Sequence, residues 1–317
     1  MYNAAETIES ALRSLRWQTF SNWELILIDD GSTDDSVQRS QALADARVRL
    51  MVDGQRRGLA ARLNQAIDLA CGRYLARVDA DDIAYPERLE RQIAYLEAHQ
   101  EVDLLGARML VFGGEGVPVG LFPVATTHDA ICARPYSGFY LPHPTWMGRT
   151  EWFRRWRYDP SCGKAQDQEL LLRSHAFSRF AALPEALVGY RQERVSVHKS
   201  LLGRGHFSRG IWRAAMRERR VAQGLGALAL QTAKLVFDAM AVATGLERAL
   251  LRHRAHPLSA EGPVSSRPAR ADRAPQNGLQ PSPRPLAARA AARLRRGATA
   301  RAASGARGLF GPRAHTP

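Results

Sequence analysis

Cysteine is scarce in this chain of 317 residues, and the few cysteines lack the spacing of a disulfide framework or a zinc site. They stand at Cys71, Cys132 and Cys162, with no C-x-x-C pair among them. An odd, widely spaced set argues against the disulfide-stapled class of small proteins and favours a reducing compartment. We therefore expect a cytoplasmic protein.

A leader peptide and a clean membrane span are also missing from the sequence pattern. Met1 is followed by neither the basic nor the apolar region of a signal peptide. The most apolar segment, residues 225–251, is interrupted by Gln231, Lys234 and Asp238. Because a membrane span needs about 20 predominantly apolar residues, we expect no spanning helix.

Acidic residues are outnumbered, but the excess of positive charge is confined to one end of the chain. The formal net charge is +14. Residues 253–317 contain twelve arginines, no lysine and two acids, a net charge of +10, which leaves +4 for residues 1–252. This Pro-, Ala- and Arg-rich tail cannot bury enough apolar surface to offset its ordering entropy, so we predict that residues 255–317 are disordered. No nucleic-acid-binding motif accompanies the charge, so we do not expect a nucleic-acid partner.

The first 200 residues, by contrast, alternate short apolar runs with amphipathic segments. The predicted strands cover residues 23–28, 48–52 and 74–78, and the predicted helices around them cover residues 4–20 and 58–71. Such alternation predicts crossover units and a mostly parallel sheet flanked by helices, which is a Rossmann-like α/β fold. Further on, residues 183–191 are predicted to form an edge strand.

Two helices are predicted within residues 201–254, after this first domain. The first is basic, and the second is strongly apolar. One interpretation is a helix pair that lies at a membrane surface. The other is ordinary packing onto the core or onto a partner subunit. The sequence thus divides into residues 1–200, 201–254 and 255–317.

The most informative stretch is residues 78–82, where Asp79, Asp81 and Asp82 directly follow an apolar strand. Clustered carboxylates are costly because they repel one another and because burial penalises each charge. A divalent cation with a phosphorylated ligand would remove that cost, since Mg²⁺ binds carboxylate and phosphate oxygens. The alternative is an acidic turn or helix cap. A second acidic loop, Asp29 and Asp30, ends another predicted strand, and parallel sheets bind ligands at such strand ends.

Taken in order, these segments resemble the family 2 inverting glycosyltransferases, which have the GT-A fold. The resemblance rests on residues 2–8, 18–20, 23–34, 58–60, 64–67, 72–74, 79–82, 86–89, 143–144 and 190–191. It implies a metal-dependent enzyme that moves a sugar from a nucleoside diphosphate sugar to a glycan or lipid-linked acceptor. Such enzymes commonly make surface polysaccharide or lipopolysaccharide at the cytoplasmic face of the inner membrane, where peripheral membrane contact is expected.

The resemblance also implies roles on the donor side. Asp30, with Asp29 beside it, matches the acid that reads the nucleotide base, although a turn-forming aspartate is the alternative. Asp81 and Asp82 match the D-x-D element, which holds the ribose and Mg²⁺ or Mn²⁺. Asp79 either assists the metal or only ends the strand.

Three further donor- and acceptor-side roles follow from the same resemblance. Arg62 either meets a phosphate or lies on a solvated helix face. Asp167 falls where the family carries its general base, and it follows Gln166 where the family commonly has Glu. His143 and Trp146 are candidates for the acceptor side, with structural and core-packing roles as their alternatives.

One departure from the family concerns the start of the chain. The family usually has a strand reading roughly V-S-V-I-I-P before its Tyr-Asn pair, whereas Tyr2 and Asn3 here follow Met1 directly. We therefore expect either a misassigned start codon or a fragment, and poor stability, because two buried strands would lose a hydrogen-bonding partner. The alternative function is a truncated or catalytically inactive nucleotide-sugar-binding protein.

Overall fold

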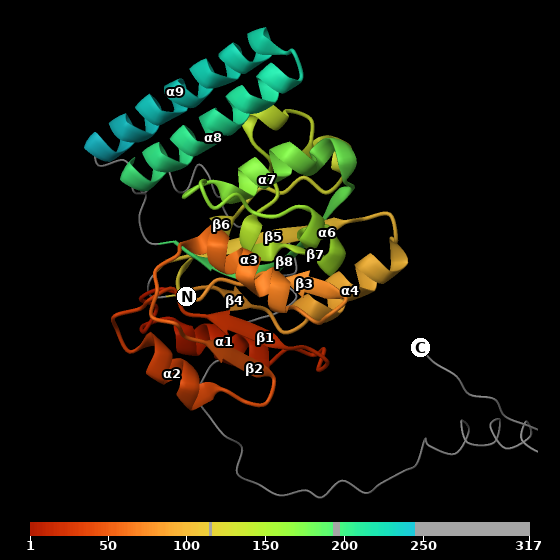
Figure 1. Cartoon of the computed structure of the whole chain (residues 1–317), viewed down its shortest axis with the longest axis vertical. Helices are drawn as coiled ribbons and strands as arrows, with labels where there is room; N and C mark the ends of the chain where they lie inside the picture. The colour runs from red at the N-terminus through yellow and green to blue at the C-terminus, as the bar shows by residue number, and fades with distance from the viewer. Residues whose placement is uncertain (114–115, 193–196, 245–317) are drawn as a thin grey trace, which may run out of the picture. The chain divides into compact units, whose positions relative to one another are not determined.

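Two β-sheets between layers of helices make up the fold (Figure 1). The computed structural model describes residues 1–113, 116–192 and 197–244. The smaller sheet consists of β1 (Leu25–Ile28) and β2 (Val48–Met51). The larger sheet has the order β3 (Tyr74–Ala76), β7 (Met147–Arg149), β5 (Leu104–Phe112), β8 (Phe180–Arg191) and β4 (Ile83–Ala84), with β6 (Pro118–Leu121) paired to β5.

Strand direction in these sheets is mixed. The pairs β1/β2 and β5/β8 are parallel, whereas β3/β7, β5/β7, β4/β8 and β5/β6 are antiparallel. The predicted α/β class is confirmed, but the strand pairs of the larger sheet are mostly antiparallel. Sequence periodicity could not give the direction of these strands, because antiparallel neighbours can also be buried on both faces.

The helices alternate with the strands over most of the chain. The α-helices are α1 (Ile8–Arg16), α2 (Ser36–Leu43), α3 (Leu59–Leu69), α4 (Arg88–Ala98), α5 (His128–Ile131), α6 (Thr150–Arg155), α7 (Gln166–Ser174), α8 (Val197–Arg217) and α9 (Val221–Ala243), and the 3₁₀ helices are η1 (Pro135–Ser137), η2 (His143–Thr145) and η3 (His175–Phe177). The first helix buries the apolar stripe that its spacing predicts, including Ile8, Leu12 and Leu15.

The strand predicted as an edge strand, β8, is instead an interior strand that pairs with both β5 and β4. A proline such as Pro184 cannot donate a ladder hydrogen bond, so it favours an edge position. The structure accommodates it in a bulge, because Leu183 pairs with Ala107 and the next pair joins Ala186 to Arg108.

A large cavity separates the two sheets. It has a volume of about 1470 Å³ and is lined by both β1 and β3. Among the described residues β1 pairs only with β2, and β3 pairs only with β7. The backbone of Met1 reaches the end of β1, since its amino group donates to the Ile28 carbonyl oxygen (2.6 Å) and its carbonyl oxygen accepts from the Asp30 N–H (2.8 Å). The predicted low stability stays a prediction.

The hydrophobic core extends to the two long helices α8 and α9. Trp146, Phe153 and Phe180 are fully buried in the main core cluster, and Phe207 and Ile211 attach α8 to it. The helical hairpin α8–α9 packs against α7 on the side away from the sheets (Figure 1). By length and composition α9 could cross a membrane, so the exclusion of a spanning helix was too strict. The predicted tail, residues 255–317, lies outside the described residues.

Candidate active site

Three carboxylates converge where β3 ends. Asp79, Asp81 and Asp82 each place one oxygen within 4.8 Å of the others. Asp82 is completely buried; its Oδ1 atom accepts from the Arg191 N–H (3.2 Å), and its Oδ2 atom has no partner among the described residues. An apolar strand leads into this turn, which buries Asp82 just before the short strand β4 and leaves Asp79 partly exposed and Asp81 exposed.

The electrostatics of this cluster are unfavourable without a cation. Burial, and then the charges of Asp79 and Asp81, raise the pKa of Asp82 to about 8. Burial and Asp79 likewise raise the pKa of Asp81. A buried carboxylate oxygen without a partner, surrounded by like charges, matches the ligand chemistry of a hard divalent cation. The residues present therefore fit Mg²⁺ or Mn²⁺.

A second acidic group, Asp30, faces the same cavity of about 1470 Å³ as Asp79 and Asp81. Its carboxylate accepts from the N–H groups of Arg57 (2.7 Å) and Gly58 (3.0 and 3.1 Å) and from Nε of Arg62 (2.9 Å). Gly58 has a φ of +85°, which favours glycine at this turn before α3. The loop after β1 is thereby fixed to the start of α3.

The side chain of Arg62 is only 5% exposed, so the alternative of a solvated helix face is wrong. It forms a bidentate pair with Asp53 (2.6 and 2.9 Å) and also bonds Gln65 and the Gln55 carbonyl oxygen. The hydrogen bonds that Arg62 donates to Asp53, and the smaller contribution of those it donates to Asp30, raise the pKa of Arg62. Its guanidinium thus supports the Asp30 loop.

The neighbouring acid, Asp29, is the one that forms the turn. It is buried and accepts from the N–H groups of Gly31 (3.1 Å) and Ser32 (3.0 Å) and from the Ser32 hydroxyl (2.6 Å). The turn-forming role considered for Asp30 therefore belongs to Asp29.

A smaller cavity, of about 380 Å³, adjoins the acid cluster and contains Asp167 and His143. Arg77 and Asp79 line both this cavity and the larger one, so the two spaces share a wall. Asp167 lies in the first turn of α7, after Ala165 in a left-handed conformation (φ 58°). Burial raises the pKa of Asp167, while hydrogen bonds from Gln168 and the charge of Arg77 act in the opposite direction.

His143 is buried on the wall of the smaller cavity. Its Nε2 atom lies 2.8 Å from the Tyr158 hydroxyl, and its ring packs edge-on against Trp146 with centroids 4.4 Å apart. Burial, and then Arg77, lower the pKa of His143 well below its ordinary value, so the ring is neutral. Trp146 is completely buried and donates to the Leu141 carbonyl oxygen. Of the two roles considered for Trp146, the structure therefore favours core packing over the acceptor side.

Arg77 and Tyr158 are the residues of this site that sequence reasoning missed. The Arg77 side chain is buried, its Nη2 atom pairs with Asp79 Oδ1 (2.5 Å), and its Nε and Nη1 atoms have no partner among the described residues. Its backbone is held by the Trp146 carbonyl oxygen and by Nη2 of Arg88. The sequence did contain a signal for Arg77, because an arginine in an apolar segment is costly to bury without a nearby acid.

Comparison with known proteins shows which family this sequence matches. The model of glycosyl transferase family 2 matches residues 1–157. EpsE of Bacillus subtilis (strain 168), described as a glycosyltransferase, is 40% identical over 157 residues, which cover 49% of this chain and 55% of EpsE. The glucosyltransferase WfgD of Escherichia coli is 37% identical over 95 residues, 30% of this chain and 38% of WfgD. The chain thus spans only part of these relatives.

Two solved structures share the fold at low sequence identity. TarS of S. aureus, residues 1–349 in complex with UDP, matches with a TM-score of 0.53 and 24% identity over 73% of this chain and 68% of that one. The mannosyltransferase PcManGT of Pyrobaculum calidifontis, in complex with GDP-Man and Mn²⁺, matches with a TM-score of 0.54 and 19% identity over 79% and 78%. The predicted resemblance is confirmed: residues 1–157 belong to glycosyl transferase family 2, and the chain has the GT-A fold.

Proposed function

We propose that this protein is an inverting glycosyltransferase that moves a sugar from a nucleoside diphosphate sugar to a hydroxyl group of a glycan or lipid-linked acceptor. One observation carries the proposal: the cavity with Asp30 and the acid cluster shares Arg77 and Asp79 with the cavity that contains Asp167. Two ligands bound in these cavities would meet beside the acid cluster. WfgD, which is named for a diphosphoundecaprenol acceptor, and the PcManGT complex with GDP-Man support this choice of substrates.

On the acceptor side, Asp167 is the proposed general base. An inverting transfer needs one carboxylate within about 3 Å of the acceptor hydroxyl, opposite the leaving group. His143 on this wall is neutral and bonded to Tyr158, and Asp79 is paired with Arg77, so Asp167 is the remaining carboxylate on this wall and the proposed base. The reaction is a single displacement and needs no covalent enzyme nucleophile.

On the donor side, Asp81 and Asp82 are the proposed ligands of Mg²⁺ or Mn²⁺, and Asp79 lies close enough to assist. When bound, the cation stabilises the negative charge that develops on the leaving diphosphate. We assign Asp30 to the nucleotide base, with Arg62 and Asp29 holding its loop in place.

Surface polysaccharide or lipopolysaccharide synthesis is the proposed setting, on the cytoplasmic side of the membrane with peripheral contact to it. A lipid-linked acceptor requires that the enzyme work close to a bilayer. The names of the relatives support this setting, since WfgD acts on a lipid-linked diphosphate.

The test is a panel of nucleoside diphosphate sugars, each incubated with the purified protein, Mn²⁺ and an acceptor extract, with release of free nucleoside diphosphate as the readout. We expect turnover that requires metal and is lost in Asp82→Asn and Asp167→Asn. Asp129→Asn is the matched control, because Asp129 is exposed on α5 and lines none of the three cavities described. Nucleotide-sugar binding without any turnover would favour the inactive binding protein.

A further inference from the structure

The helix α9 has polar residues on its buried side and large apolar residues on its exposed side. Gln231 and Asp238, at most 4% exposed, point into the protein and both bond Arg204 of α8, at 3.0 and 2.7 Å. Six of the large apolar side chains point outward and are 39–57% exposed: Val221, Leu225, Leu230, Val236, Phe237 and Met240. A surface helix in water normally has the opposite arrangement.

No charged side chain interrupts this outward face. The charged residues of α9 are Lys234 and Asp238, and Lys234 is directed to the body, where its Nζ atom donates to the Ser137 carbonyl oxygen (3.4 Å). A continuous apolar surface of this kind on a soluble protein marks a site for a membrane or another protein. The polar residues under α9 anchor it to α8 and leave the apolar residues outside.

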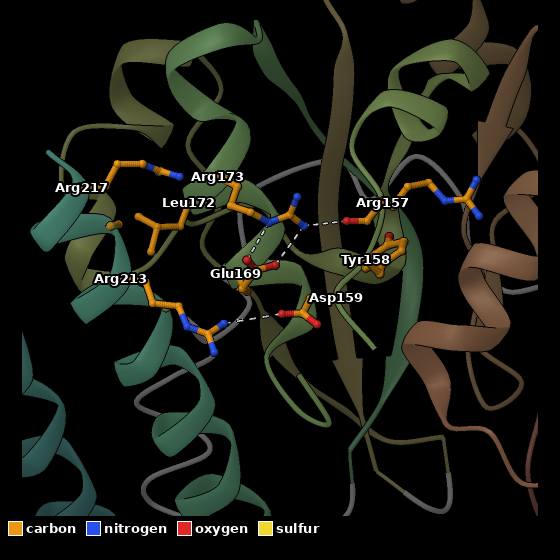
Figure 2. Close-up of a pocket in the computed structure, with 10 residues that line it drawn as sticks. Arg157, Tyr158, Asp159, Glu169, Leu172, Arg173, Arg213 and Arg217 are labelled. Carbon is orange, nitrogen blue, oxygen red and sulfur yellow. Dashed lines mark hydrogen bonds and ion pairs between the residues drawn. The ribbon is translucent and has the colours of Figure 1, made fainter. Parts of the chain in front are cut away.

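The adjoining helix α8 adds positive charge and interfacial side chains. Trp212 and Met216 are exposed on it, and Arg213 and Arg217 lie one turn apart. The two arginines extend beside a cavity of about 390 Å³ between α7 and α8 (Figure 2). Their side chains are 72% and 60% exposed, and the acids nearest to them, Asp159 and Glu218, are 3.8 Å away. Both guanidinium groups thus keep donors for an external anion.

We propose that the α8–α9 hairpin docks on a membrane that contains anionic lipid. The apolar face of α9 enters the boundary of the acyl chains, and Arg213 and Arg217 contact the phosphates of lipid headgroups. Trp212 is suited to the same boundary, because amphipathic aromatic rings favour the headgroup level. A second copy of the chain fits less well, since a symmetric contact would bring two arginine-rich helices together. The proposal gives the peripheral contact proposed above a defined surface and a lipid class.

Co-sedimentation with vesicles tests this surface on the full chain. One set of vesicles is phosphatidylcholine alone, and the other contains added phosphatidylglycerol. We expect binding to the anionic vesicles and a loss of more than about tenfold in the double variant Phe237→Asp/Met240→Asp, because a carboxylate is costly in the acyl region. Phe177→Asp is the matched control, since Phe177 is an exposed phenylalanine on η3 and should leave binding unchanged.

A second pair of variants tests the contribution of the two arginines of α8 to vesicle binding. Arg213→Ala/Arg217→Ala should lose about fivefold in vesicle affinity per residue, because each basic residue near an anionic surface contributes about 1 kcal/mol. The control Arg13→Ala/Arg39→Ala removes the same charge from α1 and α2. Equal binding to both vesicle types, no binding at all, or sedimentation velocity that shows a dimer abolished by Phe237→Asp would overturn the proposal. Nucleoside diphosphate binding, measured in parallel, separates this failure from failure of the proposed enzyme activity.

Discussion

Replacing Asp82 with asparagine should stabilise the metal-free protein at high pH and have no such effect at low pH. In the folded protein, burial and the charges of Asp79 and Asp81 raise the pKa of Asp82 from 3.8 to about 8. A carboxyl group whose pKa is raised by folding contributes stability below its unfolded pKa. That contribution is lost as the pH rises through the folded pKa. The loss therefore falls between about pH 4 and pH 8.

The size of the effect follows from the pKa difference. One pKa unit corresponds to 1.36 kcal/mol, so a shift of this size removes up to about 5 kcal/mol from the free energy of unfolding between pH 4 and pH 8.5. Asp82→Asn removes the charge but keeps the shape. The variant should therefore be more stable than the wild type by several kcal/mol at pH 8.5, and close to it at pH 4.

Urea unfolding followed by tryptophan fluorescence measures this difference, with a chelator present in the metal-free samples. Any pH-independent cost of the asparagine amide cancels when the two pH values are compared. Saturating Mn²⁺ should then stabilise the wild type at pH 8.5 and leave Asp82→Asn unchanged, because binding to the folded state alone raises stability. A difference between wild type and variant that is the same at both pH values would refute the electrostatic reasoning.

Three further predictions concern the surrounding groups. Asp167→Asn should lower kcat by about 10²–10⁴-fold and leave the affinity for nucleoside diphosphate unchanged in calorimetry, because a lost general base affects the chemical step. Arg77→Met should move the acidic limb of the pH–rate profile to higher pH, since Arg77 lowers the pKa of Asp167; an unmoved limb would show that its charge does not reach the base. Arg62→Met should cost about 3 kcal/mol in urea unfolding, because it leaves Asp30 without its cationic partner and removes the bidentate partner of Asp53, and a loss below about 1 kcal/mol would contradict the loop-anchoring role.

Much of the donor side could be predicted from the sequence because it depends on local order along the chain. Apolar runs that stop at acids identify both the strands and their polar ends, as at Asp30 and Asp82. The family resemblance then added their roles. The order and direction of the strands after residue 103 depend on pairing between distant segments, which periodicity does not encode. For this reason β8 was expected at an edge and lies inside the sheet.

The acceptor side was less predictable for a related reason. Trp146 and His143 are three residues apart, yet one is sealed in the core and the other lines the cavity. Arg77 was not predicted as a site residue. Its role depends on its contact with Asp79 and on the charge of Asp167, which is 90 residues further along the chain. Similarly, the sequence does not show which side of α9 is buried. That becomes clear only in the structure, where Arg204 of α8 bonds Gln231 and Asp238.

The central claim is that the acids after β3 hold a divalent cation next to the donor diphosphate. Anomalous diffraction at the manganese edge, from crystals grown with Mn²⁺ and a nucleoside diphosphate, tests it most directly. The account predicts one strong peak within coordination distance of Asp82 and Asp81, and also in contact with a phosphate oxygen of the nucleotide. A bound nucleotide with no peak between these carboxylates, or with its metal held elsewhere, would contradict the account.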